Sequence, residues 1–559
     1  MTFDAPPNRN YSNDLETAIQ KFRMAAYMWQ AFCSEQLYRN GFGHRTFRLH
    51  ETWQPDTLSF QDVQNKISRE TAHVHVIRAK KHSLKDILDP KIAQQSPDRD
   101  DSKKSLFSIF LEELNDYGPP FTNQNCYVAG LIMDTHWDTS RQVVLGHAAL
   151  GGGAGNIRLG IFGSHSLHSW PRWVEDIEYC FMDSTATNTR YVANDAGESG
   201  EHWKCANVGM GAMLHEVGHC LTLAHTPTGL MSRGFNNYNR TFMPVEPHNS
   251  NPLPPSAEEG SHWHRLDIIR LRYHPCFRLP SDVLPPYASS PLASEFIPLD
   301  SGLRISAPAG LTMLEIWVDG RYNRHYEFIN ERQTYLPTSY DVDLVNIKLT
   351  VGWRQGQRLR LEGSTVNQQT FEMDDIIGFV ESRIVKLPGV HGKCIKGADI
   401  GGRGLGAREA SHVILSKPAQ ESNSLVSDLR RLHLGHSRDT EDAVPNAYVT
   451  HVRIHCGDAL DGLVFFYSDG STSFLGKTGG GTREFSIAKG DRIKHFVVRA
   501  GLWVDGIEIV TEQSRSGWCG GTGGALYVVE PPKGYSLVGC FATAGDWMDS
   551  FGIYYQSSV

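Results

Sequence analysis

Residues 215–225 constrain the fold of this chain more than any other segment. They begin His-Glu-Val-Gly-His, and a third histidine follows after five more residues. On an α-helix, His215 and His219 lie one turn apart on one face, which is the spacing that two ligands of a tetrahedral zinc ion require. His225 can join them only if the helix ends first, because continued helix would rotate its side chain by about 240° from His219. The segment therefore predicts a helix, a break and a return of the chain.

Glu216 stands next to these histidines and is the residue type that peptide hydrolysis needs. A carboxylate there can hold a metal-bound water, take its proton during attack on a carbonyl and return it to the leaving amine. A purely structural zinc would take a fourth protein ligand and would not need Glu216. Chance spacing without a metal is a further alternative in a chain with 25 histidines. If His225 does not reach the metal, His264 is the reserve ligand.

Length and charge narrow the class of protein. A chain of 559 residues is too long for one hydrophobic core, so we expect several domains. The formal net charge of -8, without long acidic or basic blocks, argues against a nucleic-acid partner. The first thirty residues show no secretory signal and no apolar window is long enough to cross a membrane. We therefore expect a cytoplasmic location, with the nucleus as the alternative, and no membrane insertion.

Residues 1–280 combine helical and strand patterns and form the first predicted domain. Helical spacing of apolar residues marks residues 14–40, 200–221 and 262–273. Alternation predicts strands at residues 45–53, 72–77, 127–133 and 143–150. A glycine-rich loop then leads into a short strand at 157–162. It lacks the Gly-Lys-Ser/Thr ending of a phosphate loop, so we do not expect a nucleotide there.

The remaining chain is dominated by strand patterns. Runs at residues 311–318, 345–351 and 376–385, without a strong helix between them, predict a β-sandwich-like domain at 285–387. Further strands are expected at 449–454, 463–467, 493–498 and 504–510, within a last domain at 388–559. The polar segment 419–445 is expected to be a long exposed loop.

The three histidine spacings resemble the signature of the metzincin metallopeptidases, in which a methionine turn follows. The resemblance implies a catalytic domain of the α+β class, of the α/β/α zincin type. It implies zinc ligands, a base and a turn at His215, His219, His225, Glu216 and Met231. It also implies an edge strand that pairs with substrate, for which the candidates are Ile157, Arg158, Leu159, Gly160 and Ile161. Thr222 departs from the family pattern, which has glycine at the helix break.

Two further resemblances complete the sequence-based interpretation. Three motifs stand out in residues 1–280: the His-Glu-Val-Gly-His helix, the Leu-Gly-Gly-Gly-Ala-Gly-Asn loop and the Ser-His-Trp-His-Arg-Leu-Asp segment that begins at Ser261. On these motifs the region resembles a group of fungal zinc metallopeptidases that carry a C-terminal lectin domain. Short glycine- and aspartate-rich motifs recur in residues 449–555, at 466–470, 479–481, 504–508, 520–524 and 545–551. On these motifs the segment resembles a jacalin-related lectin, which implies a β-prism of three small sheets. In that family a glycine and an aspartate four residues apart form the sugar loop, which implies possible sugar contacts at Gly545, Asp546, Trp547 and Asp549.

The sequence therefore predicts a zinc-dependent metalloendopeptidase whose jacalin-like module binds a glycan or a partner. Its substrate would be a peptide or protein, its cofactor Zn²⁺ and its base Glu216. Three alternatives stay open: a catalytically inactive pseudo-peptidase acting as a carbohydrate-binding or scaffold protein, an aminopeptidase, and a lectin-like module that serves only docking.

Overall fold

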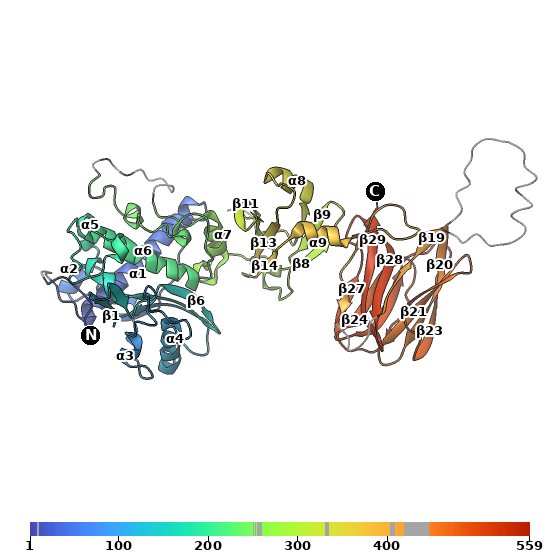
Figure 1. The fold of residues 1–559 in the computed structure, drawn as a ribbon, viewed down its shortest axis with the longest axis horizontal. Coiled ribbons are helices and arrows are strands. Elements are labelled where there is room, and N and C mark those ends of the chain that lie inside the picture. The colour runs from blue at the N-terminus through green and yellow to red at the C-terminus, as the bar shows by residue number, and fades with distance from the viewer. Residues whose placement is uncertain are drawn as a thin grey trace, which may run out of the picture. The chain divides into compact units, whose positions relative to one another are not determined.

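The computed structural model describes residues 1–7, 11–249, 251, 253, 260–329, 335–402, 409–418 and 446–558. They divide into two compact units, each described here by itself (Figure 1). The N-terminal unit comprises Met1–Ala288, Glu327–Leu336 and Ser364–Gln369. The C-terminal unit comprises Ser289–Tyr326, Pro337–Gly363 and Thr370–Val559. The division into three domains, at residues 1–280, 285–387 and 388–559, stays a prediction.

Helices make up much of the N-terminal unit. The α-helices are α1 (Leu15–Arg39), α2 (Phe60–Gln64), α3 (Leu84–Ile87), α4 (Leu106–Tyr117), α5 (Asp176–Met182), α6 (His202–Cys220) and α7 (Arg265–Tyr273). The 3-10 helices are η1 (Ser164–Ser169), η2 (Asp195–Gly197), η3 (Leu230–Ser232), η4 (Tyr238–Thr241) and η5 (Pro275–Phe277), and η6 (Pro286–Ser289) follows. The three long helices that the spacing predicted are confirmed, although α7 begins later than expected because His264 caps it.

Helix α1 begins at a capping residue and packs against α6. The side chain of Asp14 accepts a hydrogen bond from the backbone N–H of Thr17, which satisfies one of the free donors of the first turn. Farther along, the indole N–H of Trp29 donates to the carbonyl of Met210 on α6 at 3.1 Å. Trp29 is fully buried, so this contact fixes the metal-motif helix in the interior of the unit.

The central sheet of this unit has the order β3-β7-β6. Strands β3 (Cys126–Ile132) and β7 (Ile157–Gly163) are parallel, and β6 (Leu150–Ala154) is antiparallel to β7. Two hairpins, β1 (Glu51–Pro55) with β2 (Ser68–Ala72) and β4 (His136–Asp138) with β5 (Val143–Leu145), lie outside it. The strands predicted at 45–53, 72–77 and 143–150 are thus shorter than expected or displaced. The expected glycine-rich loop is itself largely the strand β6.

The C-terminal unit begins with two small sheets. One has the order β12-β9-β8, with bounds β8 (Glu295–Pro298), β9 (Gly302–Ser306) and β12 (Ser339–Asp343). The other has the order β11-β10-β13-β14, with bounds β10 (Leu311–Val318), β11 (Arg321–Glu327), β13 (Leu359–Thr365) and β14 (Thr370–Met373). The sandwich-like arrangement expected for residues 285–387 stays a prediction.

Two predicted strands of this region are wrong. Residues 345–351 lie mostly in helix α8 (Leu344–Thr350), and residues 376–385 lie mostly in helix α9 (Ile376–Arg383). Each helix begins after an aspartate whose carboxylate accepts backbone N–H groups of the first turn, Asp343 for α8 and Asp375 for α9. These N-caps outweigh the strand preference of the valines and isoleucines that follow them.

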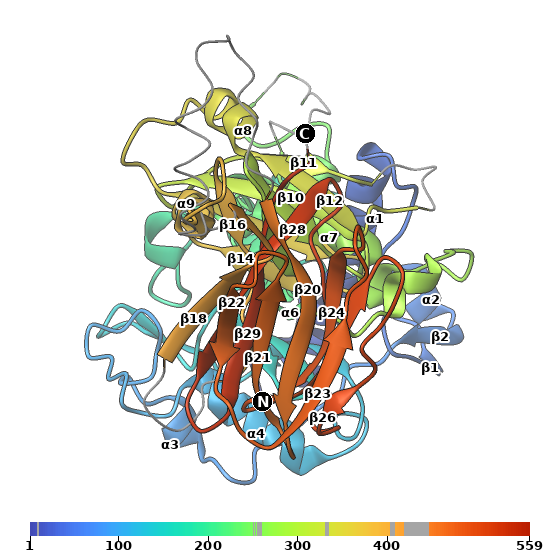
Figure 2. The ribbon, with the colours of Figure 1, turned by 90° about the vertical axis from the view of Figure 1, so that its right-hand side faces the viewer.

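A β-prism of three sheets forms the rest of the unit, and several of its strands face the viewer in Figure 2. The first sheet contains β15 (Ile384–Val385), β16 (Cys394–Lys396), β17 (Ile400–Gly401), β18 (Glu409–Ile414), β28 (Tyr535–Ala544) and β29 (Met548–Ser557). The second contains β19 (Ser416–Pro418), β20 (Asn446–Cys456), β21 (Leu460–Tyr467), β22 (Thr472–Gly476) and β23 (Gly481–Ser486). The third contains β24 (Ile493–Ala500), β25 (Val504–Thr511), β26 (Cys519–Gly520) and β27 (Ala525–Val529).

The inner faces of the three prism sheets share one apolar core. Val452, Phe465, Phe496, Ile507 and Phe551 are fully buried in it. The four strands predicted between residues 449 and 510 are confirmed as parts of β20, β21, β24 and β25. The predicted loop at 419–445 lies outside the described residues.

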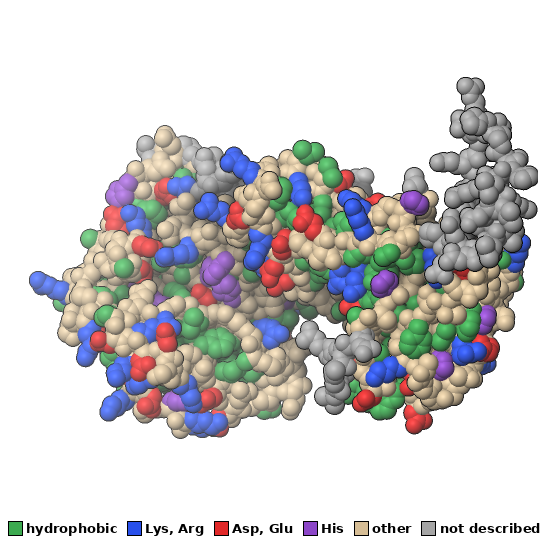
Figure 3. Space-filling model, turned by 45° about the vertical axis from the view of Figure 1, so that its right-hand side comes forward, with side chains coloured by type: hydrophobic (Ala, Val, Ile, Leu, Met, Phe, Trp, Pro, Cys, Tyr) green, Lys and Arg blue, Asp and Glu red, His purple; other side chains and the backbone are tan. Residues whose placement is uncertain are grey.

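Charged side chains of both signs are interspersed over the face of the molecule seen in Figure 3. This face shows no large field of a single sign, in agreement with the mixed charge pattern of the sequence. Within the described part of the chain, no helix is long and apolar enough to span a membrane.

Candidate metal centre

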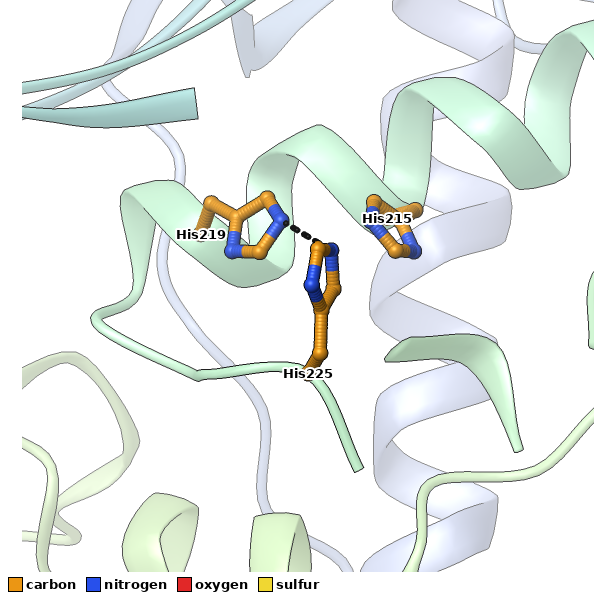
Figure 4. A group of neighbouring side chains, drawn as sticks. All are labelled: His215, His219 and His225. Atoms are coloured by element: carbon orange, nitrogen blue, oxygen red, sulfur yellow. Dashed lines mark hydrogen bonds between the residues drawn. The ribbon is translucent and has the colours of Figure 1, made fainter. Parts of the chain in front are cut away.

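Helix α6 carries His215 and His219 and ends at Cys220, as the spacing predicted. The chain then breaks at Thr222, whose φ of 66° lies in the left-handed region. Two hydrogen bonds close this C-terminal turn, from Thr222 N–H to the carbonyl of His219 and from Leu223 N–H to the carbonyl of Gly218, both at 3.0 Å. The returning chain brings His225 beneath the helix (Figure 4).

The three imidazoles converge on one point. A ligand nitrogen from each of His215, His219 and His225 lies within 4.8 Å of the other two. The Nε2 atoms of His219 and His225 are 3.2 Å apart. Two nitrogens at about 2.0–2.1 Å from a tetrahedral zinc ion are about 3.3 Å apart, so this separation suits a shared ion.

Backbone carbonyls fix the tautomers of the two helical histidines. Nδ1 of His215 lies 2.7 Å from the carbonyl oxygen of Leu230, and Nδ1 of His219 lies 2.9 Å from that of Leu223. A carbonyl oxygen only accepts, so each Nδ1 carries the proton and each Nε2 presents its lone pair. This donor set fits a zinc ion.

Burial sets the charge state of the centre. Desolvation lowers the pKa of His215 to about 4, and the pKa of His219 is also lowered by burial. Both rings are therefore neutral near pH 7, the form that binds a metal. Burial raises the pKa of the Glu216 carboxyl to about 8. A carboxyl in that range can accept and release a proton near neutral pH.

Two glycines let α6 approach the sheet closely. A Cβ on Gly160 of β7 would lie 2.4 Å from the carbonyl oxygen of Glu216, and a Cβ on Gly151 of β6 would lie 2.4 Å from the Cβ of His219. Larger residues at either position would push the helix away. The glycine-rich stretch thus brings a strand edge beside the predicted base.

Met231 lies under the helix in η3. A Cβ on Gly218 would meet its Sδ at 2.4 Å, so the methionine fills the space directly below α6. Its neighbour Leu230 supplies the carbonyl that holds His215. Gly229 opens this turn at a φ of 83°, a conformation that glycine adopts without a Cβ penalty.

Asp267 of α7 accepts a hydrogen bond from the residue after the third histidine, a contact that the sequence pattern did not predict. Its buried carboxylate accepts hydrogen bonds from the hydroxyl of Thr226 at 3.2 Å and from the N–H of His264 at 3.1 Å. Thr226 follows His225 directly. His264, the reserve ligand, accepts a hydrogen bond at Nδ1 from Leu266 N–H instead and caps α7.

The predicted substrate strand is wrong. The candidate residues Ile157, Arg158, Leu159, Gly160 and Ile161 lie in β7, which pairs with β3 on one side and β6 on the other. Its backbone groups are therefore used within the sheet. Strands β3 and β6 are the two edges of this sheet, and β6 is the edge that lies beside Glu216. Its glycine content concealed it, because glycine is depleted in strands.

The prism loop at residues 545–549 has two counterparts that sequence analysis missed. Gly457 with Asp461, Gly501 with Asp505 and Gly545 with Asp549 recur at 44-residue intervals. Each pair connects two hairpin strands across the same register shift. The glycine N–H donates to the carbonyl two residues on, at 3.0 Å in the first loop and 2.9 Å in the other two. A search for internal repeats would have found them.

Glycine-rich segments border these aspartates. A Cβ on Gly479 would lie 3.1 Å from a carboxylate oxygen of Asp461, and one on Gly523 would lie 2.7 Å from a carboxylate oxygen of Asp505. At the third loop, a Cβ on Gly401 would lie 2.4 Å from the backbone oxygen of Asp549. Trp547 is 43% exposed and lies 5.1 Å from Trp503, centroid to centroid. These loops combine acceptor oxygens with an exposed aromatic face.

Known proteins resemble this chain in both its N-terminal and its C-terminal parts. Residues 1–301 match the model of a family described as "Putative peptidase family". The chain belongs to this peptidase family. A protein named "Putative zinc metalloproteinase" from Schizosaccharomyces pombe is 33% identical over 508 residues, which cover 90% of this chain and 73% of that protein. Another of that name from Saccharomyces cerevisiae is 39% identical over 349 residues, covering 59% of this chain and 49% of that one.

The C-terminal part of this peptidase-family member matches a second model, the jacalin-like lectin domain, over residues 433–554. Among solved structures, Malaysian banana lectin aligns with 19% identity and a TM-score of 0.21, covering 30% of this chain and 99% of its own. A mannose-binding jacalin-related lectin from Ananas comosus aligns with 19% identity and a TM-score of 0.20, covering 29% of this chain and 98% of its own. The family model and the three-sheet prism agree on a jacalin-like fold.

Proposed function

We propose that this protein is a zinc-dependent endopeptidase of the metzincin kind. The observation that carries the proposal is the convergence of His215, His219 and His225 beside the buried carboxyl of Glu216. Zinc, when bound there, supplies Lewis acidity, which lowers the pKa of water and polarises a carbonyl. The family membership and the names of the two fungal relatives support this choice of ion.

Glu216 is the proposed general base and acid. Its burial disfavours the charged carboxylate, which makes proton uptake from an attacking water favourable. The same carboxyl can then deliver that proton to the leaving amine. The hydrogen bonds to Leu230 and Leu223 hold the rings of His215 and His219 in fixed orientations, so the ligand set is preorganised.

The open edge of β6 is the proposed docking site for the substrate backbone. An extended peptide can add to a strand edge through main-chain hydrogen bonds, which leaves sequence preference to side-chain pockets. Such a peptide can continue past both ends of β6, and this favours internal cleavage over the removal of single N-terminal residues. The left-handed Thr222 supports an active enzyme over a pseudo-peptidase, because the substitution leaves the return of His225 intact.

The test is a Glu216→Gln variant of the full chain, with Glu178→Gln on the exposed face of α5 as the matched control. We expect Glu216→Gln to keep zinc and to lose cleavage of a peptide library by a factor of about 10³ or more, because proton transfer is removed. Glu178→Gln should cleave like the wild type. Equal cleavage by Glu216→Gln and the wild type would refute the mechanism.

We further propose that the prism binds a glycan at its three equivalent loops. Carboxylate oxygens can accept hydrogen bonds from vicinal hydroxyls, and Trp547 can cover the apolar face of a sugar ring. A glycan array probed with the wild-type chain tests this role, and absence of binding on a broad array would favour protein docking.

We place both activities in the cytoplasm, with the nucleus as the alternative. The ten cysteines are free thiols in the structure, which suits a reducing compartment. Fractionation of cells that express the tagged full chain tests this location, and recovery of the protein from the secreted fraction would contradict it.

A further inference from the structure

A second group of three histidines lies on the hairpin of β1 and β2. His50 directly precedes β1, and His73 directly follows β2. The backbone N–H of His73 donates to the carbonyl of His50 at 2.8 Å, which continues the register set by Glu51 and Ala72. His75 stands two residues beyond His73, the spacing at which side chains of an extended chain share a face. The segment His73-Val74-His75 thus lies opposite His50 of the neighbouring segment.

The distances within this group resemble those of the centre on α6. The ring centroids of His50, His73 and His75 are 5.7, 5.4 and 4.5 Å apart, against 4.8, 5.3 and 4.8 Å in the first centre. Nδ1 of His50 and Nε2 of His75 are 3.3 Å apart. That separation equals the value of about 3.3 Å expected for two nitrogens on one tetrahedral ion.

All three rings can be reached from solution, and the surroundings of two of them favour the neutral form. Burial, together with neighbouring imidazoles, lowers the pKa of His73 and of His75. Neutral imidazole is the ligand form, so protons compete weakly for these nitrogens near pH 7. His50 and His73 are exposed and His75 is partly buried, so an ion from solution can reach all three.

His73 needs a side-chain rotation to complete the group. Among the described residues, only the histidines of the α6 centre already bring all three ligand nitrogens within 4.8 Å. Nδ1 of His73 instead lies 3.3 Å from the hydroxyl of Thr52. Exposed side chains change rotamer within nanoseconds, so this contact does not prevent the ring from turning towards His50 and His75.

We propose that His50, His73 and His75 form a second binding site for a divalent transition metal of the imidazole-preferring class, such as Zn²⁺, Cu²⁺ or Ni²⁺. A hydrogen bond between two neutral rings would account for the contact of His50 with His75, but it would not account for the third ring beside them. Three imidazoles from two neighbouring extended segments are a sufficient protein ligand set for zinc, with water in the fourth position.

The role of this site follows from its position. The strand pairing of β1 and β2 ends at Glu51 and Ala72, and one further backbone hydrogen bond joins His73 to His50, so an ion on the three rings joins the two segments at the end of the ladder. The same segments wall a cavity of about 650 Å³ that the apolar faces of α1 and β3 also line. The ion therefore clamps the hairpin and fixes one wall of this cavity.

Zinc content of the purified full chain tests the proposal, measured after dialysis against glycine as a weak competing chelator. We expect two zinc ions per wild-type chain. His75→Gln should keep only the ion of the α6 centre and weaken the second site by about 100-fold or more, because a direct ligand is lost. His219→Gln should keep only the hairpin ion. His391→Gln, an exposed histidine elsewhere in the chain, should keep both.

Cobalt spectroscopy gives a second readout that does not depend on zinc retention. Co²⁺ added to His219→Gln should give the visible absorption of a four-coordinate site with nitrogen ligands. Adding the second substitution His50→Gln to this variant should abolish that absorption. Circular dichroism checks that each variant is folded. A wild-type chain with one zinc ion, unchanged in His75→Gln, would overturn the proposal, as would a second ion that glycine removes. His219→Gln removes a ligand of the α6 centre alone. A missing ion at the α6 centre is therefore distinguished from a missing ion at the hairpin.

Discussion

The α6 centre and the prism loops use opposite designs. In the α6 centre the residues differ in kind: His215, His219 and His225 converge and Glu216 stands beside them. Asp267 accepts a hydrogen bond from Thr226, the residue after His225. In the prism, one loop design is repeated three times at 44-residue intervals, each with the same glycine hydrogen bond. The α6 centre thus divides its work among different residues, whereas the prism repeats one loop.

The two designs differ in how much a single substitution can change. A centre that needs three converging nitrogens fails as a unit when one is removed, because two protein ligands hold zinc poorly. The three loops belong to separate sheets and each carries its own aspartate, so loss of one carboxylate leaves the other two in place. Substitutions at the two kinds of site therefore test whether the α6 centre fails as a unit and whether the prism loops are lost one at a time.

The largest effect is expected for His219→Ala. Loss of one of three nitrogens should remove zinc and lower peptide cleavage by a factor of about 10³ or more. Glycan binding by the prism should not change. Metal analysis and a cleavage assay measure the effect. As a control, chelation should inactivate the wild type and added zinc should restore it, whereas zinc should not restore His219→Ala. Retained cleavage in the zinc-free variant would contradict the assigned centre.

A smaller effect is expected for Asp267→Ala. Without the carboxylate, the hydroxyl of Thr226 keeps the carbonyl of Thr228 as an acceptor but loses its bond to α7, so the segment that carries His225 is held less firmly. Groups that orient a ligand typically change metal affinity by about 10- to 100-fold, so zinc affinity should fall by that factor while kcat at saturating zinc is nearly kept. Asp267→Asn keeps one acceptor oxygen and should fall between Asp267→Ala and the wild type. Unchanged zinc affinity in Asp267→Ala would exclude this positioning role.

The contrast also explains what the sequence could predict. Spacing within one helix is local, so His215, His219 and the end of α6 followed from periodicity and breakers. Residue Asp267 is 41 positions from its partner Thr226, and no local pattern joins them. The substrate strand was misassigned because alternation marks a strand without giving its neighbours, and β7 is more regular than the glycine-rich edge β6. The short helices α8 and α9 were predicted as strands because their valines and isoleucines favour strands. The aspartate caps that start these helices are a weaker signal in the sequence.

In the prism, we expect sugar binding to fall by one site with each aspartate that is removed. If the three loops are equivalent, calorimetry with a monovalent sugar should give three sites per chain, and Asp549→Ala should leave two. The remaining sites should keep their affinity within about twofold, because each keeps its own aspartate and its own glycine hydrogen bond. Asp461→Ala and Asp505→Ala serve as matched variants, and the triple variant should bind no sugar. Complete loss of binding in Asp549→Ala alone would show that the repeat is structural and that a single loop binds.

The smallest effect concerns Thr222, where the chain departs from the family pattern. Its φ of 66° costs a residue with a Cβ about 1–2 kcal/mol, which glycine does not incur. Glycine in turn increases the entropy of the unfolded chain, which costs about 0.4–1 kcal/mol. Thr222→Gly should therefore stabilise the N-terminal unit by about 0.5–1 kcal/mol and raise its unfolding midpoint by about 1–3 °C.

Thr228→Gly is the matched control for this substitution. Thr228 is exposed in the same return segment and has no positive φ, so Thr228→Gly should lower the unfolding midpoint. Zinc affinity of Thr222→Gly should equal or slightly exceed that of the wild type, since the return of His225 is kept. A lower midpoint than the wild type would show that the threonine side chain stabilises the turn by more than the backbone strain costs.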